Sequence, residues 1–147
     1  MPSFSRRHIL PDLRSTGKKD ALAELAAAAA ARLGIEAATI LAALMEREGL
    51  GSTGLGDGYA VPHARLASLS ENTVFFTRSS KGVAFEALDK HGVHLFFLLL
   101  ATDNPASPYL ATLAGLSRSL QDDACRAELL QAENEQALLA ILNRILP

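Results

Sequence analysis

Several features that would indicate particular protein classes are missing from this sequence. A single cysteine, Cys125, excludes an internal disulfide. Fourteen basic and sixteen acidic residues leave a net charge of −2, and no segment concentrates enough lysine or arginine to attract a polyphosphate backbone. The apolar run 95–101 is far shorter than the ~20 residues that cross a bilayer. We therefore expect no nucleic-acid binding, no membrane insertion and, without a signal-peptide pattern, a cytoplasmic location.

What the sequence does contain suits one domain spanning 1–147. Its 147 residues are 49% hydrophobic, which suits one domain and leaves no room for a second. The segment 1–15 mixes polar and basic residues with Pro11, so we expect a surface arm that is loosely held and carries no function.

Hydrophobic periodicity predicts two helices, then strands, then three helices. The first helix covers 18–33 and stops at Gly34; the second runs from about Glu36 to Glu48. After these helices we expect a strand over 73–77, a reversal at 81–82, a weaker strand over 83–88 and a buried strand over 95–100. Helices then begin at Ser107-Pro108, Asp122-Asp123 and Asn134, the first with an apolar stripe at 110, 113, 116 and 120. Because the run 95–100 does not alternate, both faces of the sheet must be covered. The fold class is α/β: a single-domain layered sandwich with a mixed β-sheet flanked by helices on both faces.

The densest chemical signal is a glycine-rich loop that leads to one histidine. Five glycines in ten positions precede Tyr59-Ala60-Val61-Pro62-His63, and such density favours close approach of the backbone to a ligand. Pro62 restricts its neighbour to extended geometry, so we expect His63 at a strand end with its side chain exposed.

Histidine suits phosphoryl transfer because its pKa of about 6.5 leaves a nucleophilic ring nitrogen near neutral pH. Oxygen donors are available locally from Ser52, Thr53 and loop amides such as that of Gly54, with Arg47 in the preceding helical turn.

The segment 47–64, REGLGSTGLGDGYAVPHA, closely resembles the active-site signature of mannitol/fructose-type IIA domains of the bacterial phosphoenolpyruvate:sugar phosphotransferase system, and most of all those of the nitrogen-regulatory type. The likeness extends to KKDAL at 18–22 and FEALD at 85–89. It implies that His63 accepts a phosphoryl group from a histidine phosphocarrier, with the tele nitrogen favoured although the residues do not distinguish the two nitrogens. It also implies that Arg47 orients the phosphate and that Ser52 and Thr53 line the pocket. Implied partners of the regulatory type are potassium transport proteins and sensor kinases; no metal or organic cofactor is implied.

The sequence departs from that pattern at three positions. Tyr109 stands where the family usually has a second active-site histidine, and a phenol does not become a cation near neutral pH. His94 replaces a usual aspartate; it either compensates in the pocket or, as we favour, has a structural role. Asp57, where asparagine is common, would repel an anion if it pointed inward. Two alternatives stay open: a binding-only regulator with reduced phosphotransfer, and a sugar-specific IIA subunit.

The other chemically capable side chains are expected to be structural. His91 is interpreted as a turn residue and His8 as part of the arm, and neither has acidic neighbours at metal-ligand spacing. Glu48 and its neighbour Glu46 are interpreted as solvated helix charges. Cys125 is interpreted as a helix packing residue.

Overall fold

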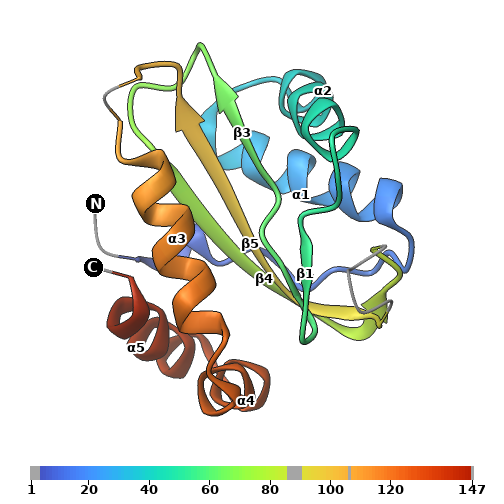
Figure 1. The fold of residues 1–147 in the computed structure, drawn as a ribbon, viewed down its shortest axis with the longest axis vertical. Helices are drawn as coiled ribbons and strands as arrows, with labels where there is room; N and C mark the ends of the chain where they lie inside the picture. Colours follow the sequence, from blue (N-terminus) through green and yellow to red (C-terminus); the bar gives the residue numbers. More distant parts are fainter. Residues whose placement is uncertain (1–3, 86–90, 106, 147) are drawn as a thin grey trace.

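The computed structural model describes residues 4–85, 91–105 and 107–146 and shows the expected order of elements (Figure 1). After a short 3-10 helix, Arg6–His8, come two helices, five strands and three helices. They are α1 (Lys18–Leu33), α2 (Ala37–Glu48), β1 (Gly54–Gly56), β2 (Tyr59–Ala60), β3 (His63–Leu66), β4 (Thr73–Val83), β5 (Val93–Thr102), α3 (Tyr109–Leu120), α4 (Asp123–Gln131) and α5 (Glu135–Ile145).

Strand β5 is the centre of a mixed sheet. Strand β4 pairs with it antiparallel on one side, with Phe76 opposite Phe97. On the other side β2 and then β3 pair with it in parallel, and β1 adds antiparallel to β2. Val61 and Pro62 separate β2 from β3, so the two behave as one strand interrupted where proline lacks an amide hydrogen. This interruption comes immediately before His63.

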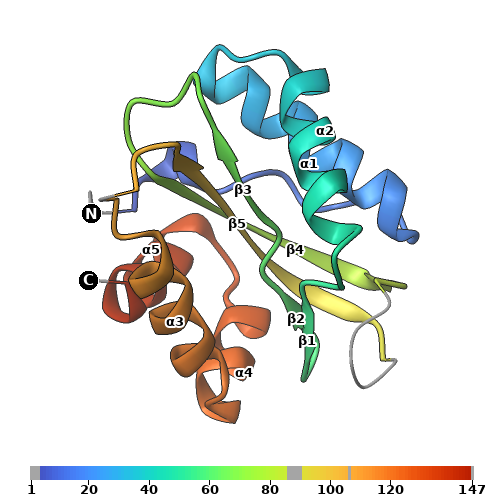
Figure 2. The same ribbon diagram turned by 45° about the horizontal axis from the view of Figure 1, so that its top comes forward.

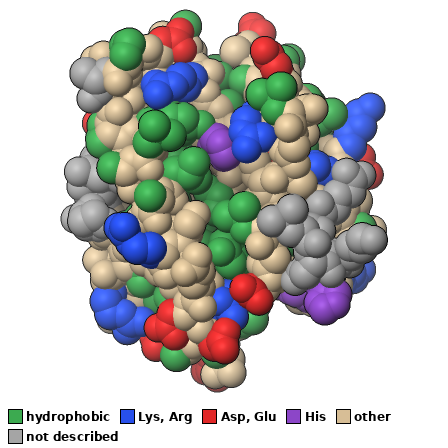
Figure 3. Space-filling view, in the orientation of Figure 1, with side chains coloured by type: hydrophobic (Ala, Val, Ile, Leu, Met, Phe, Trp, Pro, Cys, Tyr) green, Lys and Arg blue, Asp and Glu red, His purple; other side chains and the backbone are tan. Residues whose placement is uncertain are grey.

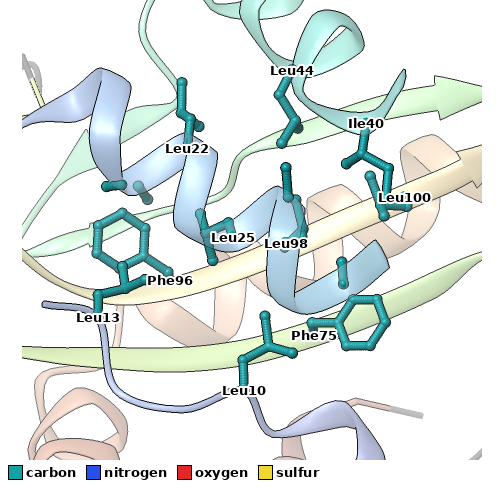
Figure 4. Close-up of a cluster of buried hydrophobic side chains, with 14 of the residues drawn as sticks. Leu10, Leu13, Leu22, Leu25, Ile40, Leu44, Phe75, Phe96, Leu98 and Leu100 are labelled. Atoms are coloured by element: carbon teal, nitrogen blue, oxygen red, sulfur yellow. The ribbon is translucent and has the colours of Figure 1, made fainter. Parts of the chain in front are cut away.

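Helices cover both faces of the sheet (Figure 2), which confirms the expected fold class. Alternate side chains of β5 point into two separate cores, as strand geometry requires. Phe96, Leu98 and Leu100 face α1 and α2, whereas Phe97 and Leu99 belong to the core beneath α3, α4 and α5. Figure 4 shows the first of these cores between β5 and the two N-terminal helices. Each fully buried leucine or phenylalanine stabilises the fold by about 1.5–3 kcal/mol relative to an exposed one.

The helix boundaries follow the local signals. Gly34 ends α1 in the left-handed conformation with φ 69°, where the missing Cβ removes the steric cost. Asp122 caps α4 by accepting from the amide of Ala124, and Asn134 caps α5 by accepting from Ala137.

The segment before α1 is not the loosely held arm that the sequence indicated. Leu10 and Leu13 are buried in the first core. The amide of Leu10 donates to the carbonyl of Phe76 over 2.8 Å, and the amide of Leu13 donates to the backbone carbonyl of Arg78 over 2.8 Å. The segment therefore lies along β4 and covers an edge that would otherwise expose unpaired backbone groups.

Four local expectations also need correction. Lys81 and Gly82 do not reverse the chain: β4 continues to Val83 with a register irregularity, and Gly82 has φ 86°, as a bulge allows. The weaker strand expected over 83–88 is not seen in its described part, because Val83 ends β4 and Ala84 makes only an isolated bridge with Gly17. Positions 86–88 lie outside the described residues. Helix α3 begins one residue later than expected, with Pro108 as its N-cap, and Leu110 on the expected apolar stripe is 73% exposed.

Candidate functional site

His63 is the first residue of β3, and its ring lies almost entirely within the protein. The carbonyl of Pro62 accepts from the amide of Leu99 over 2.9 Å, which fixes the backbone on β5. His63 pairs with Leu99 and so faces the side of the sheet covered by α3. Its side chain is only 8% exposed, so the expectation that it is exposed and not buried is wrong. The ring of Tyr109, 5.7 Å away between centroids, accounts for part of this cover.

The hydrogen bonds of the imidazole define its tautomer. Nδ1 lies 2.7 Å from the carbonyl oxygen of Val61; because a carbonyl only accepts, Nδ1 carries the hydrogen. Nε2 is then the nitrogen with the lone pair, and it accepts from Nε of Arg47 over 3.0 Å. The neutral ring therefore directs its nucleophilic nitrogen toward a guanidinium.

The surroundings also keep the ring neutral. Burial lowers the pKa of His63 below its usual 6.5, and the positive charge of Arg47 lowers it further. The carbonyl of Val61 and the carboxylate of Glu48 oppose this shift without reversing it. At neutral pH the lone pair on Nε2 is thus available, which is the requirement for nucleophilic attack.

Arg47 connects the histidine to the glycine-rich loop. It lies in the last turn of α2, where a cation interacts favourably with the helix dipole. One terminal nitrogen donates to the carbonyl of Gly51 over 2.9 Å, while Nε donates to His63. The side chain is half-buried, so its guanidinium borders both the loop and the ring.

Glu48 is not the solvated helix charge that the sequence indicated. It is buried and forms a 2.9 Å salt bridge with Lys18 at the start of α1. Its carboxylate also accepts from the amide of Thr53 over 3.0 Å and from the Thr53 hydroxyl. These bonds tie the loop after α2 to both N-terminal helices.

The loop hydroxyls have structural partners in this conformation. The Ser52 hydroxyl donates to the carbonyl of Phe85 over 3.1 Å and accepts from the amide of Gly54 over 3.0 Å. The Thr53 hydroxyl donates to Glu48. They shape the loop beside Val61, whose amide donates to the carbonyl of Thr53. A direct role of Ser52, Thr53 or Gly54 toward phosphate stays a prediction.

Tyr109 does lie beside His63, and it brings with it a cation that sequence reasoning missed. The guanidinium of Arg65 lies 4.4 Å from the centroid of the Tyr109 ring. Arg65 follows His63 by two positions on β3, and this spacing places both on one face of the strand. The period-2 rule alone would have identified it. Burial raises the pKa of Tyr109 above 10, against the effect of Arg65 and Arg47, so the phenol is neutral.

The remaining candidates lie elsewhere. His94 bonds the carbonyl of Ser79 through Nδ1 over 2.8 Å, and it is five positions before Leu99 on β5, roughly 17 Å along the strand. It has a structural role and does not replace the missing histidine at His63. Asp57, with φ 56°, is exposed in the turn between β1 and β2. Buried Cys125 packs in the second core, as expected.

On the molecular surface, a histidine side chain is visible beside a basic side chain in the region between α2 and α3 (Figure 3). Among the described residues, no group of three or more His, Cys, Asp or Glu side chains is arranged to hold a metal ion. None of the helices in the part of the chain that the structure describes is both long and apolar enough to span a bilayer.

Comparison with known sequences identifies relatives over nearly the whole chain. A nitrogen regulatory protein of Bradyrhizobium diazoefficiens is 37% identical over 134 residues, covering 91% of this chain and 88% of that protein. A fructose-specific EIIA component of Haloferax volcanii is 39% identical over 105 residues, covering 71% and 68%.

Solved structures agree with this relationship. Nitrogen regulatory protein IIA-Ntr from Neisseria meningitidis superposes with a TM-score of 0.86 at 32% identity, covering 92% of this chain and 93% of that one. IIA mannitol from Escherichia coli shares the fold at 21% identity, with a TM-score of 0.78 and coverage of 95% and 99%. The family model described as "Phosphoenolpyruvate-dependent sugar phosphotransferase system, EIIA 2" matches residues 3–145, and the chain belongs to this family.

Proposed function

We propose that this protein is a cytoplasmic phosphoryl acceptor in which Nε2 of His63 takes a phosphoryl group from a histidine phosphocarrier. The observation that carries the proposal is the pair of bonds on the ring. Val61 holds the hydrogen on Nδ1, and the lone pair of Nε2 is directed at the guanidinium of Arg47. This geometry favours the tele nitrogen, which the sequence alone did not distinguish.

The transfer requires no proton acceptor at His63. The lone pair of Nε2 forms the new N–P bond while the donor imidazole takes back the electron pair of the N–P bond that breaks. The hydrogen on Nδ1 stays in place, and the carbonyl of Val61 stabilises the positive charge that the phosphorylated ring acquires. A donor that approaches along the direction of the Nε2 lone pair places the attacking and leaving nitrogens in line with the phosphorus, as this transfer requires.

Arg47 changes its partner during this step. In the unphosphorylated protein its Nε donates to the lone pair that must attack, so the guanidinium has to leave Nε2 as phosphorus arrives. Its fork of donors then matches the oxygens of the phosphoryl group, and such charge-assisted bonds contribute about 1.5–3 kcal/mol each. The bond to Gly51 keeps the guanidinium close throughout.

The proposed output is regulatory. Similarity to a nitrogen regulatory protein over 91% of the chain supports a regulatory role, and the targets that we propose, from the resemblance of segment 47–64, are potassium transport proteins or sensor kinases. Similarity to fructose-specific EIIA proteins supports the alternative of a sugar-specific subunit. A membrane permease encoded alongside this protein, with a IIB domain that receives the phosphoryl group from His63, would favour that alternative.

Phosphorylation can be tested with phosphoenolpyruvate, enzyme I and the cognate histidine phosphocarrier. Intact-mass spectrometry should show one added phosphoryl group on the wild type and none on His63→Ala, with His91→Ala labelled normally as a matched control. A wild type that gains no mass with its cognate carrier would refute the proposal.

Tyr109 motivates the binding-only alternative, because a neutral phenol beside His63 cannot supply a positive charge. Tyr109→His should accelerate transfer if the natural site is weakened. An unchanged rate would show that tyrosine serves adequately and would remove this motive for the alternative.

A further inference from the structure

The site contains a second basic side chain whose position the mechanism above does not use. Arg65 leaves β3 on the same face as His63, opposite Ala101 of β5. One of its terminal nitrogens donates to the carbonyl of Thr102 over 2.8 Å and to that of Asn104 over 3.4 Å. These bonds hold the exposed guanidinium at the carboxyl end of β5, next to the first turn of α3.

Tyr109 connects this cation to the histidine. Its ring contacts the guanidinium of Arg65 at 4.4 Å and the imidazole of His63 at 5.7 Å, both measured to the Tyr109 centroid. A guanidinium that lies on an aromatic face still directs its N–H donors outward, within its own plane. Arg47 approaches the same imidazole from α2, so the two cations come from different elements: Arg47 contacts His63 directly, and Arg65 contacts the tyrosine ring beside it.

A phosphoryl group on a largely buried imidazole brings close to two negative charges into a poorly hydrated place. Charges in such a place are tolerated when they are paired and hydrogen-bonded. Arg47 supplies one cation. We propose that Arg65 is the second phosphoryl-binding residue of this protein, with Tyr109 as the aromatic platform that aims it; this inference rests on the proposed function of His63.

The simpler role for Arg65 is to attach the end of β5 and the segment that follows it to β3, through the carbonyls of Thr102 and Asn104. The test has to separate this role from phosphoryl binding. Arg78 provides the matched control. It leaves the neighbouring strand β4 and donates to the carbonyls of Leu129 and Ala132 in and after α4. It pairs with Leu95, four positions or roughly 13 Å along β5 from the partner of His63.

The experiment compares Arg65→Gln, Arg65→Lys and Arg78→Gln with the wild type. Transfer from the phosphorylated carrier is followed over a range of carrier concentrations to separate kcat from KM. Arg65→Gln should lower kcat by about ten- to hundredfold, Arg65→Lys should restore a large part of it, and Arg78→Gln should leave it near the wild-type value. A kcat for Arg65→Gln equal to that of the wild type or of Arg78→Gln would overturn the inference.

A spectroscopic readout distinguishes charge from structure. A cation paired with phosphate favours its more charged form, so removing Arg65 should raise the pKa of the phosphoryl group in a ³¹P titration of the phosphorylated protein. Should Arg65→Gln fail to fold, Arg65→Lys and wild type still test this shift, because a compact ammonium lacks the fork of donors. An unchanged titration for every Arg65 variant would refute the role. A wild type that takes no phosphate would refute the proposed function itself, and this inference with it.

Discussion

Arg47 and His63 share one hydrogen bond, 3.0 Å between Nε and Nε2, that joins the last turn of α2 to the first residue of β3. The bond satisfies the nucleophilic nitrogen and at the same time places a cation where negative charge would develop. Burial and the positive charge of Arg47 lower the pKa of the ring, and in our proposal the same guanidinium later binds the phosphoryl group. Two predictions about the site follow from this pair.

Removal of the guanidinium should slow phosphorylation without unfolding the protein. Arg47→Gln loses the charged partner of the phosphoryl oxygens, and we expect the rate of transfer to fall by about ten- to hundredfold. Arg144→Gln is a matched control, because Arg144 also lies in the last turn of a helix but forms an exposed salt bridge with Glu128. Rapid-quench kinetics of both variants measure the effect; equal rates for Arg47→Gln and wild type would remove Arg47 from the mechanism.

The charge state of the ring gives a prediction on pH. Because burial and the positive charge of Arg47 lower the pKa of His63 below 6.5, the neutral nucleophile should persist to more acidic pH than in an unperturbed histidine, and the transfer rate should fall only below that range. The folded protein binds this proton less readily than the unfolded chain, so His63 costs stability as pH falls through 6.5 toward its lower folded pKa. Titration of the ring by NMR should show this midpoint, and Arg47→Gln should raise it. A midpoint above 6.5 in the wild type would contradict the geometry.

Local signals predicted the helices well because each needs only nearby residues. The bounds of α1 follow from its apolar period and from a glycine in left-handed conformation at position 34. The covered faces of β5 follow from six consecutive apolar residues that supply both cores. Such patterns involve residues that are close in the sequence, and tertiary contacts changed little in the elements that they predict.

Arg65 could have been found from its local spacing, but two other features that sequence reasoning missed depend on contacts between distant segments. Glu48 resembles its exposed neighbour Glu46 until the fold brings Lys18 from α1 and the loop amide of Thr53 to its carboxylate. His63 was expected to be exposed because Pro62 interrupts the strand, but α3 places Tyr109 against the ring. Neither arrangement can be predicted from local periodicity.

The contrast between Glu48 and Glu46 leads to a prediction on stability. Glu48→Gln removes the negative charge that pairs with the ammonium of Lys18, whose side chain is only 17% exposed. We expect the free energy of unfolding to fall by about 1–3 kcal/mol. Glu46→Gln, on the exposed side of α2, should change it by less than about 0.5 kcal/mol. Urea unfolding of the two variants makes the comparison, and equal midpoints would show that the buried network contributes nothing.

The N-terminal segment is the element in which expectation and structure differ most, and its role can be measured directly. Leu10 is 3% exposed and packs beside Phe75 in the first core. Leu10→Ala removes buried methyl groups and leaves a cavity, so it should lower the free energy of unfolding by about 2–5 kcal/mol. Leu50→Ala is the control, because Leu50 in the glycine-rich loop is 83% exposed; it should change stability by less than about 0.5 kcal/mol. Chemical denaturation of both variants gives the two changes in the free energy of unfolding, with the same slope of that free energy against denaturant concentration. A Leu10→Ala variant as stable as the control would mean that the segment is held loosely after all, and that the edge of β4 needs no cover.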